Sequence, residues 1–238
     1  MKLSIIMPIY NERETIREIL EQVRNVELAV ETDSGFEINL EKEIIIIDDA
    51  STDGTREILF DEEKKGDLVL LSHKRNRGKG TGVRTGITHS TGDIVLIQDA
   101  DLEYDPRDYP TLLRPILEKR VKVVYGSRFL GPRKAMLFWH MLGNKFLTLV
   151  TNVLYNAILS DMETCYKVLD GNLARSLNLK SEGWGIDPEI TAKVLKQGHR
   201  IFEVPISYYG REYFEGKKIS WHDGFTVLWT LLKYRIVD

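Results

Sequence analysis

The chain has 238 residues, of which 42% are hydrophobic and 29% are charged. This balance is typical of a globular protein and excludes a disordered or fibrous chain. Lys and Arg number 33 against 36 Asp and Glu, so the net charge of −3 creates no global attraction for nucleic acid. A single cysteine, Cys165, excludes an internal disulfide framework and a cysteine-based zinc site. With no signal peptide recognised after Met1, we expect a cytoplasmic protein.

The first half of the chain alternates short apolar runs with helical patterns. Strands are predicted at residues 3–7, 43–48, 68–71, 94–97 and 121–125, and helices at 55–60, 81–89 and 106–118. Asn11, with Glu14 three positions later, is predicted to cap a further helix that continues to Val23. The four isoleucines at 44–47 indicate a strand buried on both faces. Together these patterns predict an α/β fold with a mostly parallel sheet covered by helices.

The second half is less regular. A helix is predicted at 188–197, a strand at 201–204 and a last helix at 225–234. Residues 27–42 are predicted to be a loop insertion, because the run Thr32-Asp33-Ser34-Gly35 breaks any periodicity. No repeat and no Pro- or Ser-rich linker divides the chain, so we predict one domain over residues 1–238.

Acidic residues gather where three of the predicted strands end. In open parallel sheets, ligands bind beyond the carboxyl ends of the strands. Asp99 and Asp101 follow the strand at 94–97, and two carboxylates so close repel each other unless a cation or a proton intervenes. Oxygen ligands suit Mg²⁺ or Mn²⁺, and Glu103 is placed to add a third oxygen. The alternative is that these acids only cap the following helix.

A basic loop covers residues 73–84, which include five Lys or Arg and no acid. Its glycines permit close backbone approach, and a helix predicted to start near Thr81 would present its N-terminus to a phosphate. The loop is not a Walker A motif, because Gly80 follows Lys79 where Ser or Thr is required. A solvated basic loop without a ligand is the alternative.

The chain resembles the family-two inverting glycosyltransferases of the GT-A fold, and in particular the branch with dolichyl- and polyprenyl-phosphate sugar synthases. The motifs that carry the resemblance occur in order along most of the sequence: Pro8-Ile9-Tyr10-Asn11-Glu12, Asp48-Asp49-Ala50-Ser51, Asn76-Arg77-Gly78-Lys79-Gly80, Asp99-Ala100-Asp101 and Gly126-Ser127-Arg128. Each motif is weak alone, but their ordered co-occurrence is specific.

The resemblance implies a Rossmann-like nucleotide-sugar-binding half over residues 1–128 and an acceptor-side half over 129–238. It implies that the donor, a UDP- or GDP-hexose, is bound by Pro8, Tyr10, Glu12, Asp49, Lys79, Asp99 and Ala100. Asp99 and Asp101 would form the DxD element that contacts Mg²⁺ or Mn²⁺, with Glu103 as a less certain third ligand. Arg128 would face the diphosphate or an acceptor phosphate, and Thr164 and Lys167 would line the same side.

A carboxylate in the region of residues 182–190 is the general base in many relatives, which makes Asp187 or Glu189 the candidate here. Alternatively, Asp187 caps the helix that Pro188 begins, and Glu189 lies on its outer face. A lipid phosphate acceptor would need no base, because its nucleophile is already anionic. The first expectation for the function is transfer to a polyprenyl phosphate. Transfer to a glycan or small-molecule hydroxyl is the second alternative, and a non-catalytic nucleotide-binding module is the third.

Two apolar stretches, 135–159 and 225–234, are expected to contact the inner face of a membrane peripherally. Polar residues interrupt the first stretch, so it is not predicted to span a bilayer. The flanking cations Arg133, Lys134, Lys145, Lys217 and Lys218 suit an anionic surface. The alternative is that both stretches belong to the core or to a homodimer interface.

Overall fold

The computed structural model describes residues 1–134, 136–211 and 223–237. Its main sheet has seven strands in the order β5-β4-β1-β6-β8-β7-β9. Their bounds are β1 (Lys2–Ile9), β4 (Glu41–Asp48), β5 (Leu68–Ser72), β6 (Ile94–Ile97), β7 (Val123–Ser127), β8 (Lys167–Asp170) and β9 (Ile201–Pro205). All neighbouring pairs are parallel except those of β8, which runs antiparallel to β6 and β7. The predicted α/β fold with a mostly parallel sheet is confirmed.

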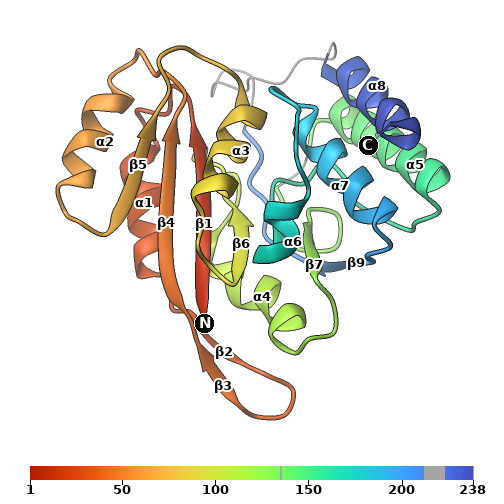
Figure 1. The fold of residues 1–238 in the computed structure, drawn as a ribbon, viewed down its shortest axis with the longest axis horizontal. Helices are drawn as coiled ribbons and strands as arrows, with labels where there is room; N and C mark the ends of the chain where they lie inside the picture. The colour runs from red at the N-terminus through yellow and green to blue at the C-terminus, as the bar shows by residue number, and fades with distance from the viewer. Residues whose placement is uncertain (135, 212–222, 238) are drawn as a thin grey trace.

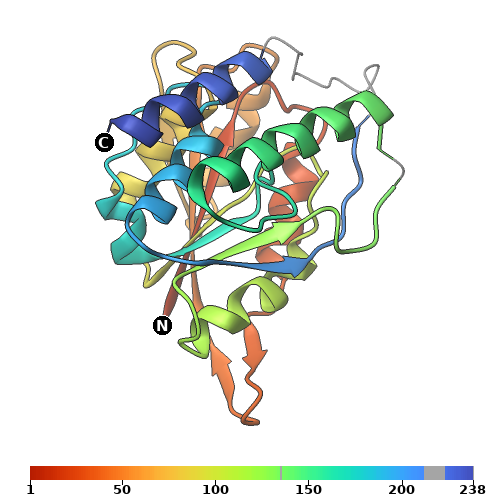
Figure 2. The same ribbon diagram turned by 90° about the vertical axis from the view of Figure 1, so that its right-hand side faces the viewer.

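Helices cover both faces of this sheet, with α3 on one face and α1 on the other (Figures 1 and 2). The helices are α1 (Ile16–Asn25), α2 (Thr55–Glu63), α3 (Lys79–His89), α4 (Tyr109–Leu117), α5 (Phe138–Tyr155), α6 (Gly171–Ser176), α7 (Ile186–Lys196) and α8 (Asp223–Ile236), with a 3₁₀ turn at Pro106–Asp108. Strands β1 and β4 pair over their whole length, and Ile5 and Ile6 face Ile44 and Ile45 in the centre of the core. The carboxyl ends of β1, β4, β6 and β7 therefore meet at one edge of the sheet.

Several local predictions are wrong. Residues 27–42 are not a plain loop, because β2 (Ala29–Glu31) and β3 (Glu37–Asn39) pair as an antiparallel hairpin that projects from the base of the sheet (Figure 1). Asn11 does not cap a helix, since α1 begins at Ile16. Instead its backbone has a positive φ of 53°, and its side-chain oxygen accepts from the Thr52 amide at 2.8 Å. Strand β8 and helix α6 were not predicted.

Helices α5 and α8 lie side by side at one end of the molecule (Figures 1 and 2). Their facing sides form a small apolar cluster that includes Leu147, Val150, Val227 and Leu231. Each helix also carries apolar side chains at helical spacing that remain exposed: Phe138, Trp139, Leu142, Phe146, Leu149 and Val153 on α5, and Phe225, Trp229, Leu232 and Ile236 on α8. No described helix is long and apolar enough to cross a membrane.

Candidate active site

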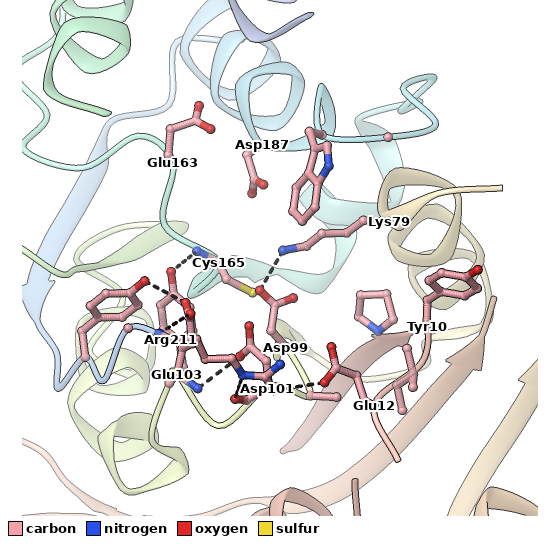
Figure 3. Close-up of a pocket in the computed structure, with 18 of the residues that line it drawn as sticks. Tyr10, Glu12, Lys79, Asp99, Asp101, Glu103, Glu163, Cys165, Asp187 and Arg211 are labelled. Atoms are coloured by element: carbon pink, nitrogen blue, oxygen red, sulfur yellow. Dashed lines mark hydrogen bonds and ion pairs between the residues drawn. The ribbon is translucent and has the colours of Figure 1, made fainter. Parts of the chain in front are cut away.

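A cavity of about 450 Å³ opens beyond the carboxyl ends of the strands and receives side chains from both halves of the chain (Figure 3). The structure brings together in its lining most of the predicted site residues: Pro8, Tyr10, Glu12, Asp49, Lys79, Asp99, Ala100, Asp101, Glu103, Arg128 and Asp187. This convergence follows from the parallel sheet, because it places the ends of β1, β4, β6 and β7 at a common edge.

Asp99 and Asp101 lie at the end of β6, on the floor of the cavity. The Lys79 ammonium contacts Oδ2 of Asp99 at 2.8 Å, so one carboxylate already has a cation beside it. Burial, together with the charges of Asp99 and Glu103, raises the pKa of Asp101. Such desolvated like charges are what a bound cation relieves, and the oxygen donors suit Mg²⁺ or Mn²⁺. Asp99 and Asp101 therefore fit a divalent cation that is shared with a ligand's oxygens.

Glu103 is held by other groups. Its Oε2 accepts from the Tyr208 hydroxyl at 2.7 Å, and its Oε1 accepts from the Arg211 amide at 2.8 Å. The described residues contain no group of three His, Cys, Asp or Glu side chains placed to hold a metal ion. In this arrangement the oxygens of Glu103 bind Tyr208 and Arg211, so the expectation that Glu103 completes a three-carboxylate site stays a prediction. Arg211 in turn contacts Glu12 at 3.0 Å and so connects β1 with this segment.

Asp49 holds the basic loop. Its carboxylate accepts from the backbone amides of Arg77 and Gly78, the latter at 2.7 Å, and lies 2.7 Å from Nδ1 of His73. The sequence analysis expected Asp49 to bind the nucleotide. In the structure the carboxylate also fixes the loop that leads into α3, which begins at Lys79 rather than at Thr81. The position of Lys79 over Asp99 depends on this anchor.

The loop glycines make a close backbone contact. A Cβ atom on Gly80 would lie 2.5 Å from the carbonyl oxygen of Ser181, and one on Gly78 would lie 2.6 Å from that of Glu182. The Thr81 amide also donates to the Glu182 carbonyl at 2.9 Å. These glycines therefore permit the close approach of the backbone at Ser181 and Glu182. The sequence analysis had expected them to permit the approach of a phosphate. The contact places the segment that carries Trp184 next to Lys79 in the cavity wall.

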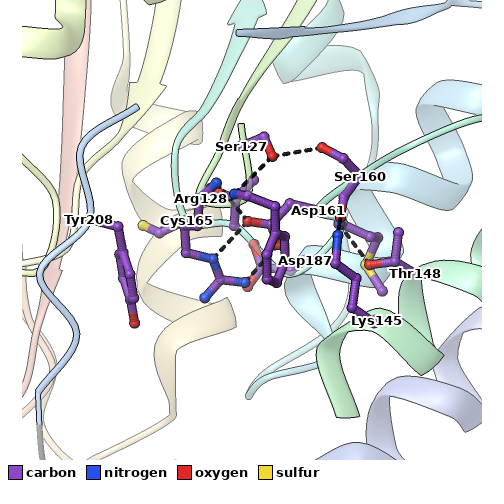
Figure 4. A network of polar contacts seen from close by, with 12 residues as sticks. Ser127, Arg128, Lys145, Thr148, Ser160, Asp161, Cys165, Asp187 and Tyr208 are labelled. Atoms are coloured by element: carbon purple, nitrogen blue, oxygen red, sulfur yellow. Dashed lines mark hydrogen bonds and ion pairs between the residues drawn. The ribbon is translucent and has the colours of Figure 1, made fainter. Parts of the chain in front are cut away.

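Arg128 is fixed by a buried ion pair that follows β7 (Figure 4). Its Nε and Nη2 atoms each donate to the Asp161 carboxylate at 2.7 Å, and its backbone amide donates to the same group at 3.0 Å. The guanidinium also lies 5.4 Å from the ring centre of Tyr208. Burial lowers the pKa of Arg128, but the charge and hydrogen bonds of Asp161, together with Tyr104 and Tyr208, raise it more, so that the pKa lies well above its ordinary value. Arg128 is thus a permanent positive charge in the cavity wall.

Asp187 contacts the Lys167 ammonium at 2.7 Å, and Lys167 is completely buried. Asp187 is not a helix cap, because α7 begins at Ile186 and Asp187 lies within its first turn. Lys167 and Thr164 do not line the cavity as expected. Thr164 is buried and donates to the carbonyl of Gly126 at 2.6 Å.

Glu189 is buried rather than on the outer face of α7. Its oxygens accept from the amides of Lys180 and Ser181, and Lys193 contacts it at 2.7 Å. Since Glu189 does not line the cavity, it is not placed to act as a base there. Its contacts instead fix the residues before α7.

Several lining residues were missed by the sequence analysis, namely His140, Asn144, Glu163, Tyr208 and Arg211. His140 and Asn144 come from α5, which the sequence identified only as an apolar stretch. Glu163 lies within a stretch whose flanking residues Thr164 and Lys167 had been singled out instead. Tyr208 and Arg211 follow β9, where no spacing or composition signals a site.

The model of glycosyl transferase family 2 matches residues 4–170. Glycosyltransferase AglJ of Haloferax volcanii is 30% identical over 211 residues, which are 88% of this chain and 63% of AglJ. The chain thus spans less than two thirds of that relative. The uncharacterized protein MJ1222 of Methanocaldococcus jannaschii is 26% identical over 242 residues, covering 99% of this chain and 93% of that protein.

Solved structures share the fold. Glucosyl-3-phosphoglycerate synthase from Mycobacterium tuberculosis, in complex with Mn²⁺, UDP and glucosyl-3-phosphoglycerate, superimposes with a TM-score of 0.71 at 17% identity. The match covers 100% of this chain and 81% of that chain. The same enzyme in complex with Mg²⁺ and UDP also gives a TM-score of 0.71. The likeness confirms the predicted GT-A architecture.

Proposed function

The chain belongs to glycosyl transferase family 2, and we propose that it transfers a hexose, with inversion, from a UDP- or GDP-sugar to a polyprenyl phosphate. The observation that carries this proposal is the cavity in which Asp99 and Asp101 lie beside Lys79, opposite Arg128 and Asp187. In this proposal residues 1–128 bind the donor and residues 129–238 form the acceptor side.

The donor side combines carboxylates with fixed cations. Pro8, Tyr10 and Glu12 line the wall next to Asp49, where a nucleotide base and ribose would lie. A divalent cation held by Asp99 and Asp101 would neutralise the negative charge that grows on the departing diphosphate. Lys79 stabilises the same charge from the N-terminus of α3, where the helix dipole adds to its effect. The structures of the mycobacterial synthase with UDP and Mn²⁺ support this choice of ligand and ion.

The acceptor side favours an anionic nucleophile. A hydroxyl acceptor requires a base that takes its proton, but the Asp187 carboxylate is bound by Lys167 and Glu189 does not reach the cavity. A phosphate monoester attacks without losing a proton, and Arg128 offers it a permanent positive charge. The ion pair of Asp187 therefore supports the lipid phosphate over the glycan or small-molecule hydroxyl.

The exposed apolar faces of α5 and α8 support a lipid-bound acceptor. Leu137 and His140 at the start of α5 line the cavity, so this helix leads from the site to the apolar surface. Trp139 is 76% exposed and Trp229 is 67% exposed, which is unfavourable unless a partner covers them. Exposed cations lie nearby on both helices and before α5, namely Arg133, Lys134, Lys145, Lys233 and Arg235. We propose that these faces rest on an anionic lipid surface; Lys217 and Lys218 lie outside the described residues.

The test of activity uses the purified chain with UDP- and GDP-hexoses, Mn²⁺ or Mg²⁺, and polyprenyl phosphate in detergent. We expect release of nucleoside diphosphate that the lipid accelerates and that chelation abolishes. Asp101→Asn should remove turnover while nucleotide binding, followed by thermal stabilisation, persists at a lower affinity. Turnover with soluble sugars but not with the lipid would refute the acceptor. Nucleotide binding without turnover under any condition would favour the non-catalytic binding module.

The membrane contact is tested by flotation with vesicles that contain phosphatidylcholine alone or with phosphatidylglycerol. The double variant Trp139→Ser, Trp229→Ser should lose binding to the anionic vesicles. Phe36→Ser is the matched control, because Phe36 is 72% exposed on the distant β2–β3 hairpin. No vesicle binding by the wild-type chain, or a dimer in light scattering that the double variant abolishes, would overturn the lipid surface in favour of a homodimer interface.

A further inference from the structure

Glu163 lines the cavity but takes no part in the contacts described above. It precedes β8 and lies on the same side of the pocket as Asp187, across from Asp99 and Asp101 (Figure 3). Its Oε1 atom is shielded from solvent, and no described residue forms a hydrogen bond with it. A buried polar atom without a partner is unfavourable by about 1–3 kcal/mol in general. Such an atom in a ligand cavity indicates that a ligand supplies the missing partner.

The charges around Glu163 determine which form of its carboxyl group is present. Asp187 and Asp161 face it as like charges, while Lys167 and Arg128 are the cations in its surroundings. Both cations are already engaged, Lys167 by Asp187 and Arg128 by both oxygens of Asp161. Burial, followed by the Asp187 charge, raises the pKa of Glu163 to about 8. Glu163 therefore carries a proton at neutral pH and is a hydrogen-bond donor without an acceptor.

A neutral carboxylic acid suits one kind of ligand in this position. It can donate to an anionic oxygen, whereas an ionised carboxylate would repel that oxygen. The donor's diphosphate is assigned to the opposite wall, at Asp99, Lys79 and Asp101. The anionic group that reaches Glu163 is therefore the phosphate of the acceptor, on the side where Arg128 supplies the positive charge.

We propose that protonated Glu163 binds the acceptor by donating a hydrogen bond to a phosphate oxygen, so that it selects a phosphate monoester over a neutral hydroxyl. This inference rests on the proposed function and deepens it. Glu163 is thus an acceptor-binding residue that loses its favourable contact, and gains a repulsion, when the pH rises through its pKa.

The experiment compares wild type with Glu163→Gln and Glu163→Met. Gln keeps a donor of the same shape without titrating, and Met keeps the volume without a polar atom. The measurement is the KM and kcat for polyprenyl phosphate between pH 6.5 and 9.5, with saturating donor and Mn²⁺. At pH 7 we expect Gln to stay within about twofold of wild type, while Met raises KM by about tenfold or more, as loss of a hydrogen bond to a charged group predicts.

The pH profile separates binding from a structural role. The KM of wild type should rise above about pH 8, whereas that of Glu163→Gln should stay flat. Ionisation of the lipid phosphate affects both proteins equally and cancels in the comparison. The nucleotide affinity and the unfolding midpoint of both variants should match those of wild type, which shows that the cavity is intact.

Three results would overturn the inference while the proposed function stands. A kcat of Glu163→Gln that falls as far as that of Glu163→Met would indicate that the carboxyl group itself, and not a hydrogen-bond donor in its place, is required. Unchanged kinetics of Glu163→Met would indicate no contact with the acceptor. An alkaline rise in KM that Glu163→Gln shares would mean that another group titrates. If wild type does not use the lipid phosphate at all, the proposed acceptor fails and the inference fails with it.

Discussion

Replacing Asp187 by Asn would leave the Lys167 ammonium buried without a charged partner. The Lys167 side chain is 0% exposed and its Nζ lies 2.7 Å from Asp187, so water cannot replace the lost carboxylate. Lys167 keeps two neutral acceptors, the carbonyl oxygens of Met162 and Thr164. Asn also offers an amide oxygen at the same place. The substitution therefore removes the charge of the partner and leaves the shape of the site unchanged.

The expected cost follows from these contacts. Removing one partner of a buried ion pair destabilises a protein by about 3–5 kcal/mol when nothing compensates. A hydrogen bond to a charged group accounts for about 1.5–3 kcal/mol, part of which the Asn oxygen retains. We therefore expect Asp187→Asn to lower the free energy of unfolding by about 2–3 kcal/mol. In a chain of this size, that corresponds to a fall in Tm of roughly 4–12 °C.

The assay is urea and thermal unfolding at pH 7.5, with Asp61→Asn as the matched control. Asp61 contacts Lys64 at the same distance of 2.7 Å, but both side chains are exposed, so the control should leave the unfolding midpoint unchanged. The double variant Lys167→Met, Asp187→Asn should recover part of the stability, because the unpaired charge is gone. If Asp187→Asn is as stable as wild type, Lys167 is not confined as its burial indicates. If the variant folds but loses all turnover with lipid phosphate, the charge of Asp187 is required for the reaction and the argument that its ion pair is only structural fails.

Four further substitutions, one of them a control, test other parts of the molecule. Lys79→Met should weaken nucleoside-diphosphate binding by about 10–100-fold in calorimetry, because a charge-assisted contact is lost, while the Tm changes little; unchanged affinity would place the diphosphate elsewhere. Gly80→Ala should destabilise by about 1–3 kcal/mol in urea, since its Cβ would lie 2.5 Å from the Ser181 carbonyl oxygen. Gly143→Ala, in open space on α5, should instead stabilise slightly, and equal effects would contradict the packing argument. For Glu43, burial raises the pKa but donors from Ser4, Thr91 and Lys2 lower it more, to about 2. This folded pKa lies below the ordinary value of 4.5, so the ionised Glu43 stabilises the folded state above pH 4.5. The contribution is about 3 kcal/mol at most. It is lost as the pH falls from 4.5 towards 2. Glu43→Gln should therefore show a smaller loss of stability between pH 5 and 3 than wild type, and parallel curves would refute this account.

The donor side of the site could be predicted from the sequence because it depends on local order. Most of its residues lie at or just after the end of a strand, and a parallel sheet brings those strand ends to one edge regardless of the details of packing. Asp49 and Asp99 are examples, since each lies within two residues of the end of β4 or β6. The residue type at a strand end was therefore enough to predict where these carboxylates lie.

The contacts of several site residues could not be predicted in this way, because they depend on residues far apart in the sequence. Asp187 lies 20 positions from Lys167, and the contact is set by the turn that leads from β8 through α6 to α7. Glu103 was expected to bind a metal ion, but Arg211, 108 positions later, takes one of its oxygens. The hairpin at residues 29–39 was missed for a similar reason, since its strands have three residues each and are too short for a periodic signal.

The two sides also differ in how their charges are balanced, and this difference bears on specificity. On the donor side, Lys79 contacts Asp99 alone, and burial with the charges of Asp99 and Glu103 raises the pKa of Asp101, so a divalent ion would be what keeps both aspartates charged at neutral pH. On the acceptor side, Asp161 and Asp187 are each bound by a buried cation, and burial keeps Glu163 neutral. A region balanced in this way can accept an added phosphate without displacing any side chain, whereas a free carboxylate would repel it. If the proposed acceptor is correct, its selection depends on ion pairs behind the cavity wall as much as on the residues that touch the substrate.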